Sequence, residues 1–412
     1  MIITEVVNLI LENLWGFYTA LLISAALSLT ISYIMIRRFV SGMIVSQITF
    51  AFNFAVILFA RYMGYLGNSA LLQFVFIEIL VTVLMFYIYR RVLASRAELM
   101  DKISRFAGGK VAVTVVFVFL FLIMLNQYFV PKDGGSRIGY MVLWWFSYIR
   151  LIVSIVMPLC YFLAVNFLES RRYLLSMSLM SVMVIQNATS GSKAGFIVGL
   201  FGMLMLHRDL NGGKIRIVRI NPVWAAIAGS AAIGAVVLIL QRLGATLWDI
   251  LFRLVMHAEA TIMVYLSAEP TEACHGVTLF AALHRGIARL FNDPSATNID
   301  TLFGFALSAI HYGANTLTGP NSSIPAYFAC NFPGWLSLIG LLAVLGYVAF
   351  VRYVFRKWVL SESGAAIWLL PFLVASINTF PQDYYTGMSH LTTMAIISLF
   401  FVFYGKLTAY AK

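Results

Sequence analysis

A carboxylate, a guanidinium and an imidazole recur at helical spacing late in the chain. Asp249, Arg253 and His257 stand four residues apart, which places all three side chains on one face of an α-helix. Ion pairs on a solvated helix face have the same spacing, so that interpretation stays open. The intervening residues are mostly apolar, however, and a charged stripe on an apolar helix is typical of a helix that lines a polar cavity. Glu259 is a further carboxylate nearby.

A second basic group follows in the same part of the chain. Arg285 and Arg289, next to His284, are four residues apart and share a helix face. Guanidinium groups match phosphate oxygens with two parallel hydrogen bonds, so these arginines and Arg253 suit an anionic ligand. Contact with lipid headgroups, or pairing with the aspartates that follow, explains the same residues without a ligand.

The stretch from Asn187 to Lys193 combines an amide, hydroxyls and glycine with a lysine, just before a predicted helix. Gly191, Gly195 and Gly199 recur every four residues, a spacing that lets a neighbouring membrane helix approach closely. A helix N-terminus with hydroxyl groups and a lysine is also an anion site. The spacing of a Walker A loop is missing. Phosphate binding and helix packing alone therefore both remain open.

Three further ionisable residues fall at or inside apolar runs. Glu78 lies near the middle of one run, where a charge costs about 3 kcal/mol on insertion scales, so it needs a partner or a role. A buried salt bridge and a function explain it equally well. Arg61 and Arg150 lie near the ends of their runs, where an arginine side chain usually extends toward the lipid headgroups.

Metal ligands and nucleophiles are sparse. No His-x3-His, His-Glu-x2-His or Asp-x-Asp pattern occurs in the part of the chain that carries the histidines and arginines above, and Gly-x-Ser-x-Gly is absent. We therefore expect neither a metal nor a cofactor. Cys274 and Cys330 could form a disulfide, which sequence spacing alone does not test.

The elements that must position these residues are membrane helices. The 412 residues are 61% hydrophobic and 11% charged, whereas soluble proteins carry about 25% charged residues. A disordered chain would not contain 33 phenylalanines and 20 tyrosines, and three cysteines exclude a disulfide scaffold. The composition predicts an all-α, polytopic integral membrane protein.

Runs of about 20 apolar residues divide the chain into three parts. Residues 1–240 hold eight predicted spans, residues 241–332 form one long connection, and residues 333–412 hold three more. The predicted total is therefore about eleven transmembrane helices. The spans lie near 14–36, 41–60, 69–89, 111–130, 149–168, 173–187, 194–206, 222–240, 333–351, 365–380 and 389–404.

Basic residues predict the orientation. Alternate connections carry 19 of the 28 lysines and arginines, and the positive-inside rule places these connections in the cytoplasm. The C-terminus is then inside and the N-terminus outside. Because topology accounts for the net charge of +12, no nucleic-acid partner is needed.

The connection over 241–332 lies on the predicted outer side and concentrates the polar chemistry. It holds six of the 16 carboxylates and four of the six histidines. Apolar residues at helical spacing, interrupted by Pro270, Pro294 and Pro320, indicate a large helical segment. We expect its helices to lie at the membrane surface, or partly to re-enter it, over a cavity between the spans.

This organisation resembles the Wzy-type O-antigen and polysaccharide repeat-unit polymerases of the bacterial inner membrane. Thr189–Gly195 is similar to the Ser-Gly-Ser-Arg-Gly loop of that family, with Lys193 in place of the arginine. Gly319–Phe328 and Asn331–Trp335 together are similar to its segment before a late span, although Pro333 interrupts the Phe-Gly pair. The resemblance implies a helical membrane fold like that of GT-C glycosyltransferases, with the active site facing the periplasm.

The resemblance also implies the reaction and its partners. A growing glycan would pass from undecaprenyl pyrophosphate to a sugar hydroxyl of an incoming lipid-linked repeat unit. Since pyrophosphate is a good leaving group, arginines, lysines and a base suffice without a metal. The expected partners are undecaprenyl-pyrophosphate-linked oligosaccharides, membrane lipids and a chain-length regulator protein.

Candidate residues follow from that reaction. His311 is the favoured general base, with His257 and Glu259 in reserve. Tyr312, Asn315 and Asn321 would hydrogen-bond sugar hydroxyls. The pyrophosphate ligands would be Lys193, Arg253, Arg285 and Arg289, with Arg150 and Arg61 as weaker candidates.

Other functions remain open. An O-antigen ligase would share the fold and the leaving group and differ only in its acceptor. A lipid-linked glycan flippase would also be basic and polytopic, but it would carry charges toward a central cavity from many spans. A membrane O-acyltransferase is a further possibility. Sugar composition and linkage cannot be deduced from the sequence.

Overall fold

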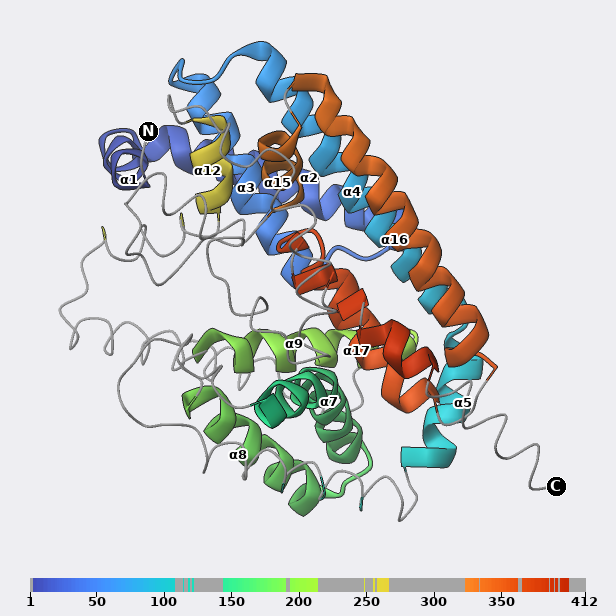
Figure 1. The fold of residues 1–412 in the computed structure, drawn as a ribbon. Coiled ribbons are helices and arrows are strands. Elements are labelled where there is room, and N and C mark those ends of the chain that lie inside the picture. The colour runs from blue at the N-terminus through green and yellow to red at the C-terminus, as the bar shows by residue number, and fades with distance from the viewer. Residues whose placement is uncertain are drawn as a thin grey trace.

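In the computed structural model the described part of the chain consists of helices and their connections, with no strand among these residues (Figure 1). For 105–107, 144–155, 185–189 and 193–198 the backbone alone is described. The described residues are 3–107, 144–189, 193–213, 258–266, 323–332, 334–361, 365–384 and most of 386–399, with a few isolated helical positions besides.

The helices follow one another along the chain, with two short elements of other types. These two are a 3₁₀ helix, η6 (Gly334–Ile339), and a π-helical turn, η7 (Phe355–Val359), which flank α16. The α-helices are α1 (Ile3–Glu12), α2 (Leu14–Ile36), α3 (Ile44–Tyr62), α4 (Asn68–Ala94), α5 (Arg96–Ala107), α7 (Trp144–Glu169), α8 (Tyr173–Thr189), α9 (Lys193–Leu210), α12 (Glu259–Tyr265), α15 (Ile324–Asn331), α16 (Gly340–Val354) and α17 (Ala365–Thr379).

Four described helices are long and apolar enough to cross a membrane: α2, α3, α4 and the continuous stretch Gly334–Val359. Shorter apolar helices cover Val156–Glu169, Tyr173–Val184 and Leu369–Thr379. The prediction of a helical membrane protein is therefore confirmed in these coarse terms. The total of eleven spans stays a prediction, because those near 111–130 and 222–240 lie outside the described residues.

Burial distinguishes the central span from those at the periphery. In the most apolar stretch of α3, 67% of the residues are buried, against 33% in α2 and in Gly334–Val359. On α2, Leu22 and Ile23 are more than half exposed, as is Leu342 on α16. Apolar side chains that face outward from a membrane helix suit contact with lipid, which is as apolar as they are. We place α3 inside the bundle, with α2 and α16 at its edge.

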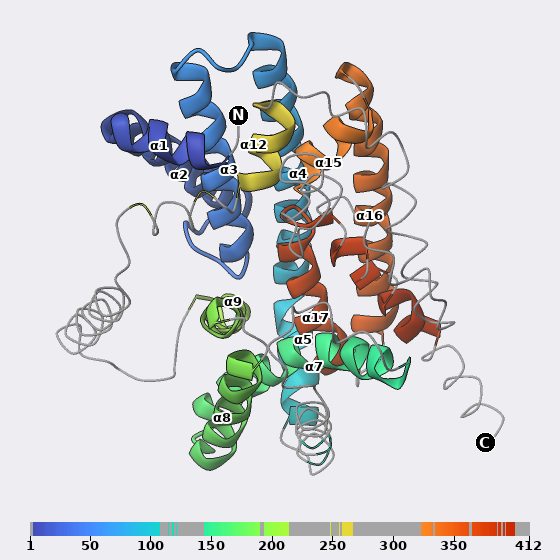
Figure 2. The ribbon, with the colours of Figure 1, turned by 60° about the vertical axis from the view of Figure 1, so that its left-hand side comes forward.

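The helices form two groups. α2, α3 and α4 pack together, and α16 runs beside α4, while α7 packs on α8, α9 and α17. Figures 1 and 2 show α7, α8 and α9 at the opposite end of the molecule from α12 and α15. α15 is tied to the turn that follows α17, because the Ile324 backbone N–H donates to the carbonyl oxygen of Pro381 at 3.3 Å. Helices α12 and α15, from the two ends of the connection over 241–332, therefore pack with α17 beside α3 and α4.

Candidate functional site

The residues predicted to form the site fall into three groups in the structure. Glu259 and Arg61 are described with their side chains, and Lys193 and Arg150 with the helical backbone alone. The third group lies outside the described residues, so where its members lie in the fold stays a prediction. It comprises His257, Arg253, Arg285, Arg289, His311, Tyr312, Asn315 and Asn321.

Two of the predicted phosphate ligands stand at helix ends. Lys193 is the first residue of α9, so the prediction that a helix begins after the Gly/Ser run is confirmed, while anion binding there stays a prediction. Arg61 lies in the last turn of α3 and is exposed. Its Nη1 donates to the carbonyl oxygen of Leu66 at 3.4 Å, across the turn that leads to α4.

Glu259 begins α12 and is only 7% exposed. α12 packs against α3 and α15, and its residues from Ala260 to Met263 are also buried. The described residues of this part of the 241–332 connection therefore pack into the helix bundle, while the choice between a surface and a re-entrant arrangement stays a prediction.

Four polar residues from different elements meet beneath α12, and we call them the buried polar cluster: Asn53, Glu78, Thr261 and Ser323. Asn53 comes from α3, Glu78 from α4, Thr261 from α12, and Ser323 precedes α15. The Thr261 hydroxyl donates to Asn53 Oδ1 at 3.4 Å and lies 3.1 Å from the Ser323 hydroxyl. The Asn53 side chain also lies beside the Glu78 carboxylate. Both ends of the outer connection thus contribute a hydroxyl to one site.

Glu78 is the member of this cluster that carries a carboxyl group, and it is 2% exposed. It stands ten residues after the first residue of α4, about 15 Å along the helix axis. Its Oε2 atom and the Nδ2 atom of Asn53 are buried without a hydrogen-bond partner, which costs about 1–3 kcal/mol for each such group. No ion pair to Glu78 occurs among the described residues, so they do not supply the salt bridge that its sequence position suggested as one explanation.

Tyr265, at the end of α12, lies between the buried polar cluster and α15. Its hydroxyl donates to the carbonyl oxygen of Pro325 at 3.3 Å, and its ring meets the Phe74 ring edge-on at 5.5 Å. Burial raises the pKa of the Tyr265 hydroxyl above its usual range, and the nearby Glu78 carboxylate raises that pKa further. Tyr265 therefore stays a neutral hydrogen-bond donor.

Sequence reasoning singled out Glu78 but missed its neighbours. Asn53 is the member that a sequence signal could have revealed, because it interrupts an apolar run from Phe50 to Ala60, and polar residues inside spans are costly. Thr261 and Ser323 carry no such signal, since threonine and serine are common in any segment. Only the packing of α12 and the start of α15 on α3 and α4 brings these hydroxyls to Asn53.

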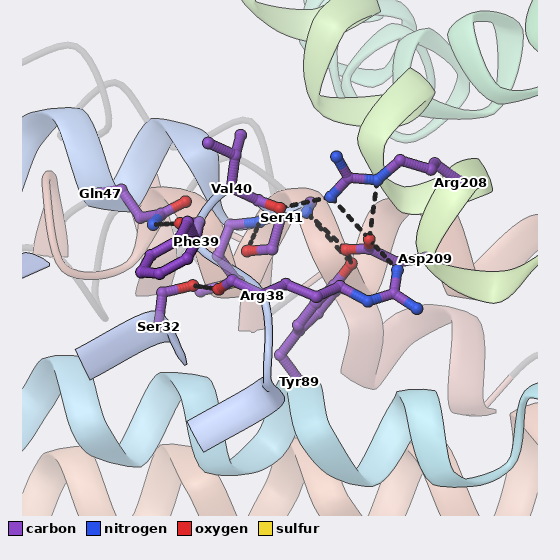
Figure 3. A network of polar contacts seen from close by, with 11 residues as sticks. Ser32, Arg38, Phe39, Val40, Ser41, Gln47, Tyr89, Arg208 and Asp209 are labelled. Atoms are coloured by element: carbon purple, nitrogen blue, oxygen red, sulfur yellow. Dashed lines mark hydrogen bonds and ion pairs between the residues drawn. The ribbon is translucent and has the colours of Figure 1, made fainter. Parts of the chain in front are cut away.

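A second network of polar contacts lies near the first residue of α3 and is centred on Asp209 of α9 (Figure 3). The Asp209 side chain is fully buried and forms ion pairs with Arg38 and Arg208. It also accepts hydrogen bonds from the Tyr89 hydroxyl at 2.7 Å and from the Gly42 backbone N–H at 3.0 Å. This network joins the α2–α3 connection, α4 and α9.

The position of Arg38 in this network depends on how α2 ends. Arg37 caps α2 in the left-handed conformation, with φ of 60°, which turns the chain toward α9. The Arg208 guanidinium binds Asp209 and also donates to the carbonyl oxygen of Val40 (Figure 3). Because both carboxylate oxygens have donors, we interpret the Asp209 network as a clamp between helices and not as a ligand site.

The described cysteines differ in state. Cys330 in α15 is disulfide-bonded and Cys160 in α7 is a free, buried thiol. Cys274, the partner suggested from the sequence, lies outside the described residues. No group of three or more histidine, cysteine, aspartate or glutamate residues that could hold a metal ion occurs in the described part of the chain.

Comparisons with protein-family models, with curated proteins and with solved structures find no match for this chain. The function must therefore be inferred from the residues themselves. In the described part of the chain, buried side-chain atoms without a hydrogen-bond partner occur at Asn53 and Glu78, and also at Ser46, Gln47, His390 and Ser398. Asn53 and Glu78 lie under α12, which belongs to the connection that carries the predicted chemistry.

Proposed function

We propose that the chain is a membrane glycosyltransferase that polymerises undecaprenyl-pyrophosphate-linked oligosaccharide repeat units into O-antigen or a related surface polysaccharide. The observation that carries the proposal is the packing of α12 and α15 into the bundle over a buried carboxylate of α4. These two helices come from opposite ends of the connection that holds most of the polar chemistry. The resemblance of Thr189–Gly195, Gly319–Phe328 and Asn331–Trp335 to the Wzy-type family supports the same function.

In the proposed reaction an oxygen of the acceptor sugar attacks the anomeric carbon of the growing glycan. The bond from that carbon to the pyrophosphate oxygen breaks, and undecaprenyl pyrophosphate departs with the bonding electrons. A base takes the acceptor proton, with His311 favoured over His257 and Glu259. Arg253, Arg285, Arg289 and Lys193 would neutralise the charge that develops on the pyrophosphate.

The proposed location is the bacterial inner membrane, with the active site facing the periplasm. The basic connections support this orientation, because 19 of the 28 lysines and arginines fall on the other side. The disulfide state of Cys330 agrees with an outer position for α15, since disulfides persist in oxidising compartments such as the periplasm.

Deleting the protein from its native host tests the proposal. On a gel, we expect the long chains of the surface polysaccharide to be replaced by single repeat units attached to an intact core. Loss of all repeats from that core would instead identify a ligase or a flippase, because both act before any repeat reaches the core. A polysaccharide of unchanged length would refute all three functions.

Complementing the deletion with single variants tests the charge argument. Arg253→Ala should fail to restore long chains while the protein accumulates normally, because the pyrophosphate loses a guanidinium that can donate two parallel hydrogen bonds to it. Arg172→Ala is the matched control, since it removes an exposed arginine from the connection between α7 and α8 on the predicted cytoplasmic side. Equal chain lengths with the two variants would show that Arg253 only contacts headgroups.

A further inference from the structure

Four basic side chains lie where α4 and α16 end beside each other. The two helices run side by side (Figure 1), and each carries an arginine in its last turn, Arg91 on α4 and Arg352 on α16. Arg356 and Lys357 follow in the π-helical turn η7. We call these four residues the basic end group. All four are exposed, and none of them forms an ion pair within the described part of the chain.

Tyr87 connects the arginines of the two helices. Its hydroxyl accepts hydrogen bonds from Arg91 Nε at 3.2 Å and from Arg91 Nη2 at 3.0 Å, and Arg352 is close enough to act on it electrostatically. Two guanidinium groups from different helices therefore approach one phenol oxygen, whose hydrogen can donate to a further acceptor. A helix dipole favours a cation at the end of each helix, but like charges that approach each other repel unless an anion lies between them.

An apolar surface leads along both helices to the basic end group. Phe76 on α4 is 50% exposed and Leu345 on α16 is 48% exposed. Tyr87 follows Phe76 by eleven residues, and Arg352 follows Leu345 by seven. Each of these spacings brings the two residues to within about 20° of each other around an ideal helix. The exposed surface therefore changes from apolar to cationic along one face of each helix.

An anionic phospholipid has the same two parts in the same order, because its acyl chains end in a negatively charged phosphate headgroup. The positive-inside rule places the basic end group in the cytoplasmic leaflet, and basic pockets between helices on that side bind such headgroups. We propose that the α4–α16 surface binds one anionic phospholipid, with its phosphate between Arg91 and Arg352 and its acyl chains along the exposed apolar side chains. The Tyr87 hydroxyl donates to a phosphate oxygen. This site does not depend on the proposed function.

The test titrates purified, detergent-solubilised protein with phosphatidylglycerol and counts the bound lipid molecules by native mass spectrometry. We expect one molecule to bind more tightly than the following ones. Arg352→Ala should weaken this binding about 5-fold, which corresponds to about 1 kcal/mol for a basic residue at the membrane surface. Phosphatidylcholine should bind more weakly than phosphatidylglycerol, because its cationic headgroup amine would meet four like charges.

Two further variants separate this site from a general attraction to positive charge. Arg91→Ala removes the cation of the other helix and should weaken binding by a similar factor. Arg172→Ala is the matched control, because it removes an exposed arginine from the connection between α7 and α8, on the same predicted side of the membrane. This control should bind phosphatidylglycerol as the wild type does.

Three results would overturn the proposal. Equal losses with Arg352→Ala and Arg172→Ala would show that the lipid responds only to the total charge. Unchanged binding in both Arg352→Ala and Arg91→Ala would remove the site from this surface, and equal binding of phosphatidylcholine would remove the preference for an anion. Glycerol 1-phosphate, which lacks acyl chains, should not displace the lipid at equal concentration. Displacement would assign the arginines to a soluble phosphate compound and overturn the lipid site.

Discussion

Replacing Asp209 with asparagine should lower the unfolding temperature by about 6 °C. The carboxylate accepts from Arg38, Arg208, Tyr89 and the Gly42 backbone N–H, and its side chain has no exposed surface. Asparagine keeps the shape but removes the charge, and it turns an N–H₂ group toward donors that need an acceptor. Breaking a buried ion pair by changing one partner costs about 3–5 kcal/mol.

The lower end of that range applies here. The two arginine side chains are each 19% exposed, so water partly hydrates them once the charge is gone, and we expect a loss of about 3 kcal/mol. A change of this size shifts the unfolding temperature by roughly 2 °C per kcal/mol in a large domain. The suitable assay follows the loss of the monodisperse species of purified, detergent-solubilised protein after heating steps.

Glu98→Gln provides the matched control for Asp209→Asn. Glu98 pairs with Lys102 at 3.0 Å within α5, and its side chain is 52% exposed. Such an exposed pair contributes about 0.3–0.5 kcal/mol, so the unfolding temperature should fall by less than about 1 °C. If Asp209→Asn behaves like Glu98→Gln, the Asp209 network does not hold the helices together and our reasoning is wrong.

Three further predictions concern packing, topology and catalysis. Gly340→Ala should lower the unfolding temperature, because its Cβ would overlap the Phe328 ring and overpacking costs about 1–3 kcal/mol. Gly346→Ala on the same helix is the control. Its Cβ meets no atom within 4 Å, so this variant should not lower the unfolding temperature. In a cysteine-free background, an impermeant maleimide applied to intact spheroplasts should label a cysteine at Asn292 and spare one at Lys102; the reverse pattern would invert the predicted topology. Purified protein should elongate lipid-linked repeat units in EDTA as fast as in magnesium, and activity that needs an added divalent ion would exclude the metal-free reaction.

The spans were predictable where apolar length alone decides the structure. The run expected near 14–36 is the helix Leu14–Ile36, and the run near 69–89 lies within Asn68–Ala94. About 20 apolar residues have few alternatives to a helix in lipid. α1 was not predicted, because Ile3–Glu12 is too short to read as a span.

The candidate site was predictable only in part, because its contacts join distant parts of the chain. Glu78 was recognisable as a carboxylate within an apolar run. Its neighbour Asn53, however, is hydrogen-bonded to Thr261, which reaches Asn53 because α12 packs on α3. The Asp209 network left no signal at all. Arg208 and Asp209 read as ordinary residues of a basic connection. The ion pair of Asp209 with Arg38 and the hydrogen bond from Arg208 to the Val40 carbonyl oxygen appear only in three dimensions.

The Asp209 network also constrains the order in which contacts can form while the protein is being synthesised. Arg38 and Asp209 are separated by 171 positions in the sequence, which a ribosome needs roughly 10–30 s to synthesise at 5–20 residues per second. Until Asp209 has been synthesised, Arg38, the Gly42 N–H and the Tyr89 hydroxyl lack their common acceptor. We therefore expect the contacts that join the α2–α3 connection and α4 to α9 to form only after α9 has been synthesised.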